Sequence, residues 1–149
     1  MSLELAKPTF EERVAAFNET YELKKISAPE MAGRLINFLK IIKEEITEGD
    51  ELLEKIQNGK LSDLDAVVEM ADWLGDIQVY CASEMIRYDI PVDETLQIIM
   101  DSNESKLGED GKPMHDERGK IIKGPNYWKP EPKIKELLIN HGNQTQEGI

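Results

Sequence analysis

The sequence has little cysteine and little histidine, and both shortages exclude classes of site. Cys81 is the only cysteine among 149 residues, so no disulfide can form within the chain. The two histidines, His115 and His141, are preceded three residues earlier by lysine and leucine rather than by glutamate. A ferritin-like di-iron bundle uses Glu-x-x-His pairs, so the sequence argues against that class of helical protein.

Positive charge and long apolar runs are also scarce. The chain has 18 basic and 30 acidic residues and a net charge of −12, which argues against a DNA or RNA partner because phosphate backbones bind basic surfaces. No apolar run approaches the length of a membrane span, and Met1–Ala6 lacks the apolar segment of a signal peptide. We therefore expect no membrane partner and a cytoplasmic protein.

The hydrophobic periodicity predicts an all-α fold, an antiparallel four-helix-type bundle in a single domain of residues 1–149. Short connections and capping residues divide the expected helices. The first begins at Phe10 after a Thr9 cap and fades near Leu23; the others run from Ala28 to Asn58, from Ser62 to about Tyr88, and from Glu94 to about Leu107. The bundle core is therefore expected over about residues 28–107.

From residue 108 onward the pattern changes to turns and short apolar segments. Turn signals at Gly108–Gly111 and Asp116–Gly119 border two short segments, which predicts a small β-hairpin within residues 108–130. In residues 131–149 we expect a short helix over Pro132–Ile139 and a loose tail from His141.

Two acidic pairs occupy positions where core residues are expected. Glu45 and Glu48 are three residues apart, and Asp72 and Asp76 are four apart, so each pair shares one helical face. Glu45 interrupts an apolar seam, and Asp72 interrupts the apolar stripe of the next helix. Buried carboxylates without nearby bases favour a hard divalent cation. Gly49, in the middle of the same helix, indicates a close approach by another backbone or by a ligand, or a local kink.

Two features near the C-terminus each allow two interpretations. Asn103 and Lys106 end the apolar stripe of the fourth helix. Either the helix frays toward solvent there, with the lysine cation favoured at a helix C-terminus, or the two side chains bind phosphate beside the acids. Lys123, Tyr127 and Trp128 lie on a loop that either forms one wall of a ligand site or is pinned to the bundle.

Several of these motifs resemble the all-α NTP pyrophosphohydrolases, the group that includes MazG, dimeric dUTPases and phosphoribosyl-ATP pyrophosphohydrolase. Glu45-Ile-Thr-Glu48 resembles the family's E-x-x-E, and Asp72-Trp-Leu-Gly-Asp76 is similar to its D-x-x-x-D variant. The segments Asn103–Gly111 and Gly119–Tyr127 are similar to the region after the bundle in the phosphoribosyl-ATP branch, so the likeness spans about residues 30–130. The family's commoner second motif, E-x-x-D, also fits Glu69-Met-Ala-Asp72, which leaves two registers open.

The resemblance implies a Mg²⁺-dependent or Mn²⁺-dependent hydrolase that cleaves the α–β bond of nucleoside triphosphates in nucleotide-pool house-cleaning. Its expected metal ligands are Glu45, Glu48, Asp72 and Asp76, with Glu44 or Glu69 orienting the attacking water. It implies that Asn103, Lys106 and Lys123 bind phosphate or sugar, and that Tyr127 or Trp128 covers the base. It also implies a homodimer or homotetramer. The alternatives are phosphoribosyl-ATP hydrolysis in histidine synthesis and a non-catalytic helical interaction module, which has no reason to bury Glu45 and Asp72.

Overall fold

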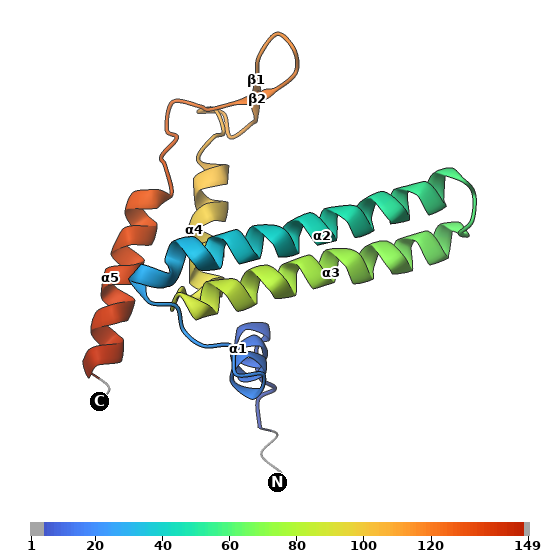
Figure 1. Cartoon of the computed structure of the whole chain (residues 1–149). Helices are drawn as coiled ribbons and strands as arrows, with labels where there is room; N and C mark the ends of the chain where they lie inside the picture. The colour runs from blue at the N-terminus through green and yellow to red at the C-terminus, as the bar shows by residue number, and fades with distance from the viewer. Residues whose placement is uncertain (1–4, 148–149) are drawn as a thin grey trace. The chain divides into compact units, whose positions relative to one another are not determined.

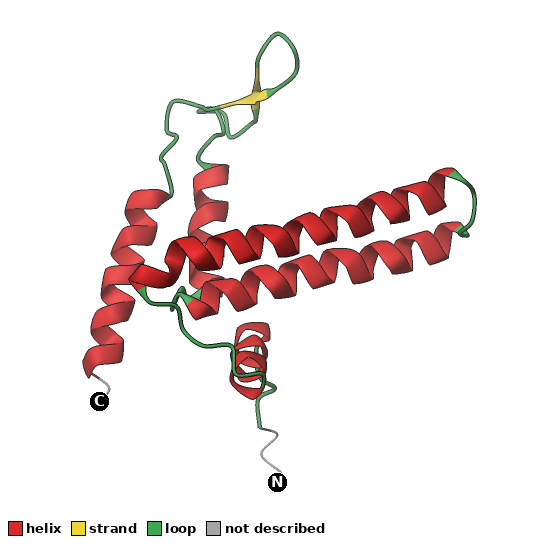
Figure 2. Cartoon of the chain, viewed as in Figure 1, coloured by secondary structure: helices red, strands yellow, loops and turns green. Residues whose placement is uncertain are grey.

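A computed structural model describes residues 5–147, with side chains described from residue 5 to residue 143. The chain is all-α with a two-stranded antiparallel sheet near its C-terminus (Figures 1 and 2), so the predicted fold class is confirmed. It divides into two compact units, Met1–Asp89 and Ile90–Ile149, and each is described by itself. No helix within residues 5–147 combines the length and the apolar character that crossing a bilayer requires.

The first unit is built on two long helices that lie side by side and antiparallel, α2 (Met31–Gln57) and α3 (Asp63–Arg87) (Figure 1). A single 3₁₀ turn, η1 (Ala28–Glu30), leads into α2. The Ser62 hydroxyl caps α3 by accepting a hydrogen bond from the Asp65 backbone amide at 3.1 Å. The helix boundaries predicted from caps and periodicity are therefore close to those observed.

The α2–α3 pair is held in register where Trp73 meets Gly49. The Trp73 indole Nε1 donates a hydrogen bond to the Glu45 carbonyl oxygen at 2.9 Å. A Cβ atom added to Gly49 would lie 2.7 Å from Trp73 Cζ2, a separation that real Cβ atoms do not show. A close approach at Gly49 is therefore observed, but the group that approaches is the indole ring of the partner helix rather than a backbone or a ligand.

Helix α1 (Phe10–Thr20) packs on α3 through a buried polar contact. The Asn18 Nδ2 donates to the Ser83 carbonyl oxygen at 3.0 Å, and the Ser83 hydroxyl donates to Asn18 Oδ1 at 2.6 Å. Only 4% of Asn18 is exposed, so these bonds form away from water. Reciprocal buried bonds of this kind fix where α1 sits on α3.

The second unit contains α4 (Val92–Glu104), a hairpin of β1 (Met114–His115) and β2 (Ile121–Ile122), and α5 (Glu131–Glu147), which packs on α4. The hairpin lies where the sequence predicted it, with Met114 opposite Ile122. The loose tail expected from His141 is wrong as far as residue 147, because α5 continues through it. Once a helix has started, each further residue adds a backbone hydrogen bond, and this outweighs the modest helix propensities of the residues from His141 onward.

The loop after the hairpin is fastened to α4 through backbone contacts. The Gly124 amide donates to the Lys106 carbonyl at 2.7 Å, and a Cβ atom there would collide with the carbonyl oxygens of Lys106 and Leu107. The Ser102 hydroxyl donates to the Trp128 carbonyl oxygen at 2.9 Å, and the Trp128 amide donates to the Ser105 hydroxyl at 3.2 Å. Glycine is required at position 124 because only it permits this close approach.

Candidate functional site

The first candidate site is an acidic cavity of about 390 Å³ between α2 and α3. Glu48, Asp72 and Asp76, three of the four expected metal ligands, line it. Two further carboxylates that line it are Glu51 and Glu69, and Trp73 forms part of the wall. The two acidic motifs, which are about 25 residues apart in the sequence, are therefore brought to one groove by the antiparallel pairing of their helices.

Glu45 lies in the seam between the two helices, and it is the buried acid of this group. Only 6% of it is exposed, and its Oε2 has no hydrogen-bond partner among the described residues. Burial raises the pKa of the Glu45 carboxyl, and the neighbouring charges of Glu48, Asp76 and Glu44 raise it further. The prediction that Glu45 replaces a core residue is confirmed, and the replacement has an electrostatic cost.

The other three expected ligands are exposed, which corrects the expectation that all four acids are interior. Asp72 was expected within the apolar stripe of its helix, yet its side chain is open to solvent, as are those of Glu48 and Asp76. The stripe itself is open there, since Val68 is 57% exposed. Within this unit α2 and α3 cover each other along one seam only, and Glu45 is the acid that lies in that seam.

Asp76 and Glu69, which belong to the two possible registers of the second acidic motif, both line the acidic cavity but have different neighbours. The charge of Asp76 contributes to the raised pKa of the Glu45 carboxyl. Glu69 is instead engaged in an ion pair, with its Oε2 3.4 Å from Lys55 Nζ. Glu44, the other residue expected to orient the water, is exposed and does not line the acidic cavity, and its charge contributes to the raised pKa of the Glu45 carboxyl.

Tyr80, which was not among the expected site residues, lies near the same acids. Burial raises the pKa of its phenol, and the charges of Glu45 and Asp76 add to the effect. The spacing was a usable signal, because residues four apart on a helix share a face and Tyr80 follows Asp76 by four. The phenol is a hydrogen-bond donor close to Glu45 and Asp76.

The acids suit a hydrated divalent cation better than a fully coordinated one. Within residues 5–147 no three acidic, histidine or cysteine side chains already stand in a metal-binding arrangement. The donors are nevertheless all carboxylate oxygens, and the unpaired Oε2 of Glu45 is a buried acceptor that lacks a positive partner. Mg²⁺ keeps several waters and is usually bound through one or two carboxylates plus substrate phosphates. The residues present therefore fit that ion.

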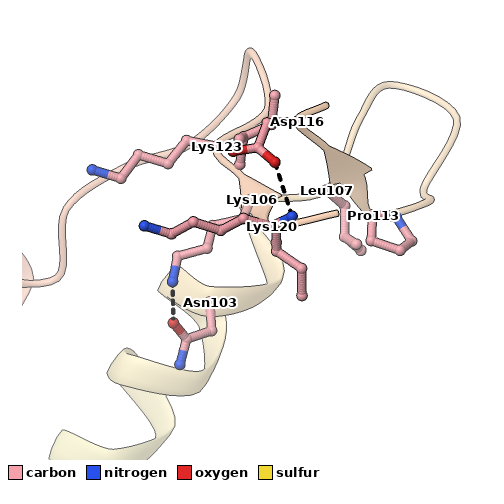
Figure 3. Close-up of a pocket in the computed structure, with 9 residues that line it drawn as sticks. Asn103, Lys106, Leu107, Pro113, Asp116, Lys120 and Lys123 are labelled. Atoms are coloured by element: carbon pink, nitrogen blue, oxygen red, sulfur yellow. Dashed lines mark hydrogen bonds between the residues drawn. The ribbon is translucent and has the colours of Figure 1, made fainter. Parts of the chain in front are cut away.

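The second unit has a basic cavity of its own, of about 750 Å³, between the end of α4 and the hairpin (Figure 3). Asn103, Lys106 and Lys123 line it, as does Lys120, which the sequence did not single out as a site residue. Lys106 Nζ donates to Asn103 Oδ1 at 2.9 Å. The end of α4 therefore lines a cavity, as expected if Asn103 and Lys106 bind phosphate. The residues that line this cavity include none of the acids of α2 and α3.

The two loop aromatics already have partners within the second unit. The Nζ of Lys123 lies 4.8 Å from the ring centroid of Tyr127, and that of Lys133 lies 3.8 Å from the ring centroid of Trp128. Both rings are half-buried, and the Trp128 backbone is hydrogen-bonded to α4. These contacts support the interpretation of a loop pinned to a helix more than that of a free cover for a base.

Neither a protein-family model nor a curated protein sequence matches the chain. A solved structure from Exiguobacterium sp. 255-15, described as a "putative NTP pyrophosphohydrolase", matches it with a TM-score of 0.54 and 18% sequence identity. The match covers 100% of this chain and 89% of that one. The chain therefore shares the fold of that structure.

Proposed function

We propose that the chain is a nucleotide pyrophosphohydrolase that cleaves the α–β phosphate bond and releases a nucleoside monophosphate and pyrophosphate. The observation that supports this most directly is the buried Glu45, whose Oε2 is unpaired beside Glu48 and Asp76. A buried acid whose neighbours are other acids destabilises the fold, and a cation bound among them would offset that cost. The shared fold described above supports the same proposal.

A divalent cation is part of the proposal because the acidic side chains of the site and the phosphates of the nucleotide are both negatively charged. Glu45, Glu48, Asp72 and Asp76 would hold Mg²⁺ or Mn²⁺, which when bound neutralises phosphate charge and lowers the pKa of a coordinated water. Glu44 or Glu69 would accept a proton from the attacking water, and the Tyr80 phenol, beside Glu45 and Asp76, would donate a hydrogen bond. Trp73 acts indirectly, since its bond to the Glu45 carbonyl holds that part of α2 in place.

The basic cavity of the second unit is proposed to bind phosphate groups. Lys106 and Lys123 offer ammonium groups and Asn103 offers an amide to anionic oxygens. Replacing Lys106 or Lys123 with methionine should raise KM for a nucleoside triphosphate with a smaller effect on kcat. An unchanged KM in both variants would contradict this role.

The proposed activity is tested by a pyrophosphate-release screen over canonical, deoxy and modified nucleotides and phosphoribosyl-ATP, with and without Mg²⁺ or Mn²⁺. Glu48→Gln and Asp76→Asn should abolish release while far-UV circular dichroism shows unchanged helicity. Glu54→Gln is the matched control, because Glu54 is an exposed acid of the same helix that does not line the acidic cavity. Release at the wild-type rate by both site variants would refute the assignment, and no release from any nucleotide would favour an interaction module.

A second copy of the chain is the partner we propose. Along one face of α2 the apolar side chains of Leu35, Leu39, Ile46 and Leu53 are between 48% and 56% exposed. Their spacing of four and seven residues is that of a helix-packing seam. Sedimentation equilibrium should show a dimer or tetramer, and Leu39→Lys with Ile46→Lys should yield a monomer, whereas Glu54→Lys should not. A monomeric wild-type protein would contradict the proposal.

A further inference from the structure

A second cavity in the first unit, of about 540 Å³, shares only Asp76 and Tyr80 with the chemistry proposed above. It is lined by residues of α1, α2, α3 and the segment after α1. Its walls include four aromatic rings, those of Phe17, Tyr21, Phe38 and Tyr80. A concave, mostly apolar site of this size with a few polar groups is typical of small-molecule binding.

The cavity is preformed because α1 is fixed on α3. The buried bonds between Asn18 and Ser83 set the position of α1, and Ser83 itself lines the cavity. The ring centroids of Phe17 and Tyr21 are 4.4 Å apart with an interplanar angle of 34°, so the α1 wall presents one continuous aromatic surface. Aromatic side chains of this kind favour stacked or edge-to-face contacts with a planar aromatic ligand.

The polar residues of the lining include Asp76, Ser83 and Arg87, and two others, Arg34 and Glu84, form an ion pair. Arg34 Nε donates to both carboxylate oxygens of Glu84, at 2.8 and 2.9 Å, and the two side chains are only 20% and 11% exposed. The terminal nitrogens of Arg34 make no hydrogen bond to the described residues, and each oxygen of Glu84 retains an unused lone pair. A largely buried ion pair contributes little net stability, so its presence calls for another explanation. The pair offers donors and acceptors side by side, as the edge of a nucleobase does.

The aromatic cavity and the acidic cavity meet at one residue. Asp76 lines both. Tyr80 lines the aromatic cavity, and its phenol is within electrostatic reach of Glu45 and Glu48. A ligand with a planar apolar end and a polyanionic end could therefore occupy both, with Asp76 at the junction.

We propose that this cavity binds the base of the nucleotide substrate, with Arg34 and Glu84 recognising its hydrogen-bonding edge; this inference rests on the proposed function. Arg34 donates to a ring carbonyl, and Glu84 accepts from the adjacent ring or amino N–H. Guanine, uracil and thymine present a carbonyl next to an N–H, whereas adenine has no carbonyl. The substrate class is therefore nucleotides whose base has a carbonyl next to an N–H, and adenine nucleotides bind more weakly.

Photo-crosslinking of the wild-type protein tests where the base lies without relying on turnover. The probe is 5-iodouridine 5′-monophosphate, which has no anhydride bond to hydrolyse. Mass spectrometry should find the adduct on Phe17, Tyr21, Phe38 or Tyr80. Excess UMP should compete with the probe and reduce the amount of adduct. Adducts confined to Tyr127 or Trp128, or no adduct that UMP competes away, would overturn the inference.

Calorimetric titration of the full chain with UMP, GMP and AMP tests the recognition. The wild type should bind UMP or GMP about 10- to 100-fold more tightly than AMP, as expected for hydrogen bonds to charged groups. Arg34→Met combined with Glu84→Gln should remove that preference. Lys25→Met is the matched control, since it breaks the exposed ion pair with Asp89 in the same unit. A preference that survives in the double variant, or is absent from the wild type, refutes the assignment.

These measurements separate the inference from the proposed function. Adducts in the aromatic cavity without pyrophosphate release would leave a nucleotide-binding protein that is not this hydrolase. Pyrophosphate release without such adducts would support the hydrolase activity but would mean that the base of the nucleotide binds outside this cavity. Should the double variant fail to fold by circular dichroism, the wild-type adduct map still decides where the base binds.

Discussion

The contact between Gly49 and Trp73 gives a prediction in which two opposing effects can be weighed. A Gly→Ala change in the interior of a helix stabilises by about 1 kcal/mol. At Gly49, however, the new Cβ would lie 2.7, 3.2 and 3.3 Å from three indole atoms of Trp73. The ring cannot retreat freely, since its Nε1 is bonded to the Glu45 carbonyl. Overpacking of this kind costs about 1–3 kcal/mol, so Gly49→Ala should be neutral or destabilise by up to about 2 kcal/mol.

Gly75 in α3 is the matched control, because a Cβ there would meet nothing within 4 Å. Gly75→Ala should therefore keep the full gain of about 1 kcal/mol, and the two variants should differ by about 1–3 kcal/mol. The assay is urea unfolding followed by the fluorescence of Trp73 in a Trp128→Phe background, since these are the two tryptophans of the chain. Equal stabilisation by Gly49→Ala and Gly75→Ala would refute the argument that the indole fixes the spacing of α2 and α3.

Three further predictions concern buried polar groups and close contacts. Asn18→Ala should lower the free energy of unfolding by about 1–3 kcal/mol, because it leaves the Ser83 hydroxyl unpaired. Adding Ser83→Ala should lower it little further. If thermal unfolding showed the two effects to be fully additive, that would contradict a paired interaction. Because the pKa of Glu45 is raised in the fold, the free energy of unfolding should fall as pH rises from the ordinary glutamate pKa through that raised value. The Glu45→Gln variant should lose less stability over this pH range, and Mg²⁺ should stabilise it less than it stabilises the wild type. A slope unchanged by Glu45→Gln would contradict the burial argument. Gly124→Ala should expose the hairpin loop to limited proteolysis, whereas Gly142→Ala should not, because only the first collides with backbone.

Much of the first unit could be predicted from the sequence because local signals and tertiary packing agree. The Thr9 hydroxyl accepts from the Glu12 amide at 3.2 Å, and Ser62 caps α3, as the capping patterns indicated. Glu45 could be placed in the helix seam because the 3.6-residue period fixes which positions face a partner. These features depend on a few neighbouring residues, so the sequence alone determines them.

The parts that escaped prediction depend on distances between elements. Arg34 and Glu84 are 50 residues apart, and nothing local marks either as a partner of the other. Asp72 has the periodicity of a buried position, yet its exposure depends on whether a further element covers that face of α3. Periodicity identifies the face of a helix, but it does not say how much of that face is covered.

The distribution of burial among the acids has a consequence for how the site works. With Glu48, Asp72 and Asp76 exposed, water screens their mutual repulsion, so the electrostatic cost falls mainly on Glu45. A single strained carboxylate is a cost that the α2–α3 packing can offset, and the helices are therefore expected to form without a metal ion. The same exposure leaves the groove open to a hydrated cation with phosphates attached, which could not enter a closed core. Binding should then lower the pKa of Glu45 and stabilise the pair, which links occupancy of the site to the stability of the helices that build it.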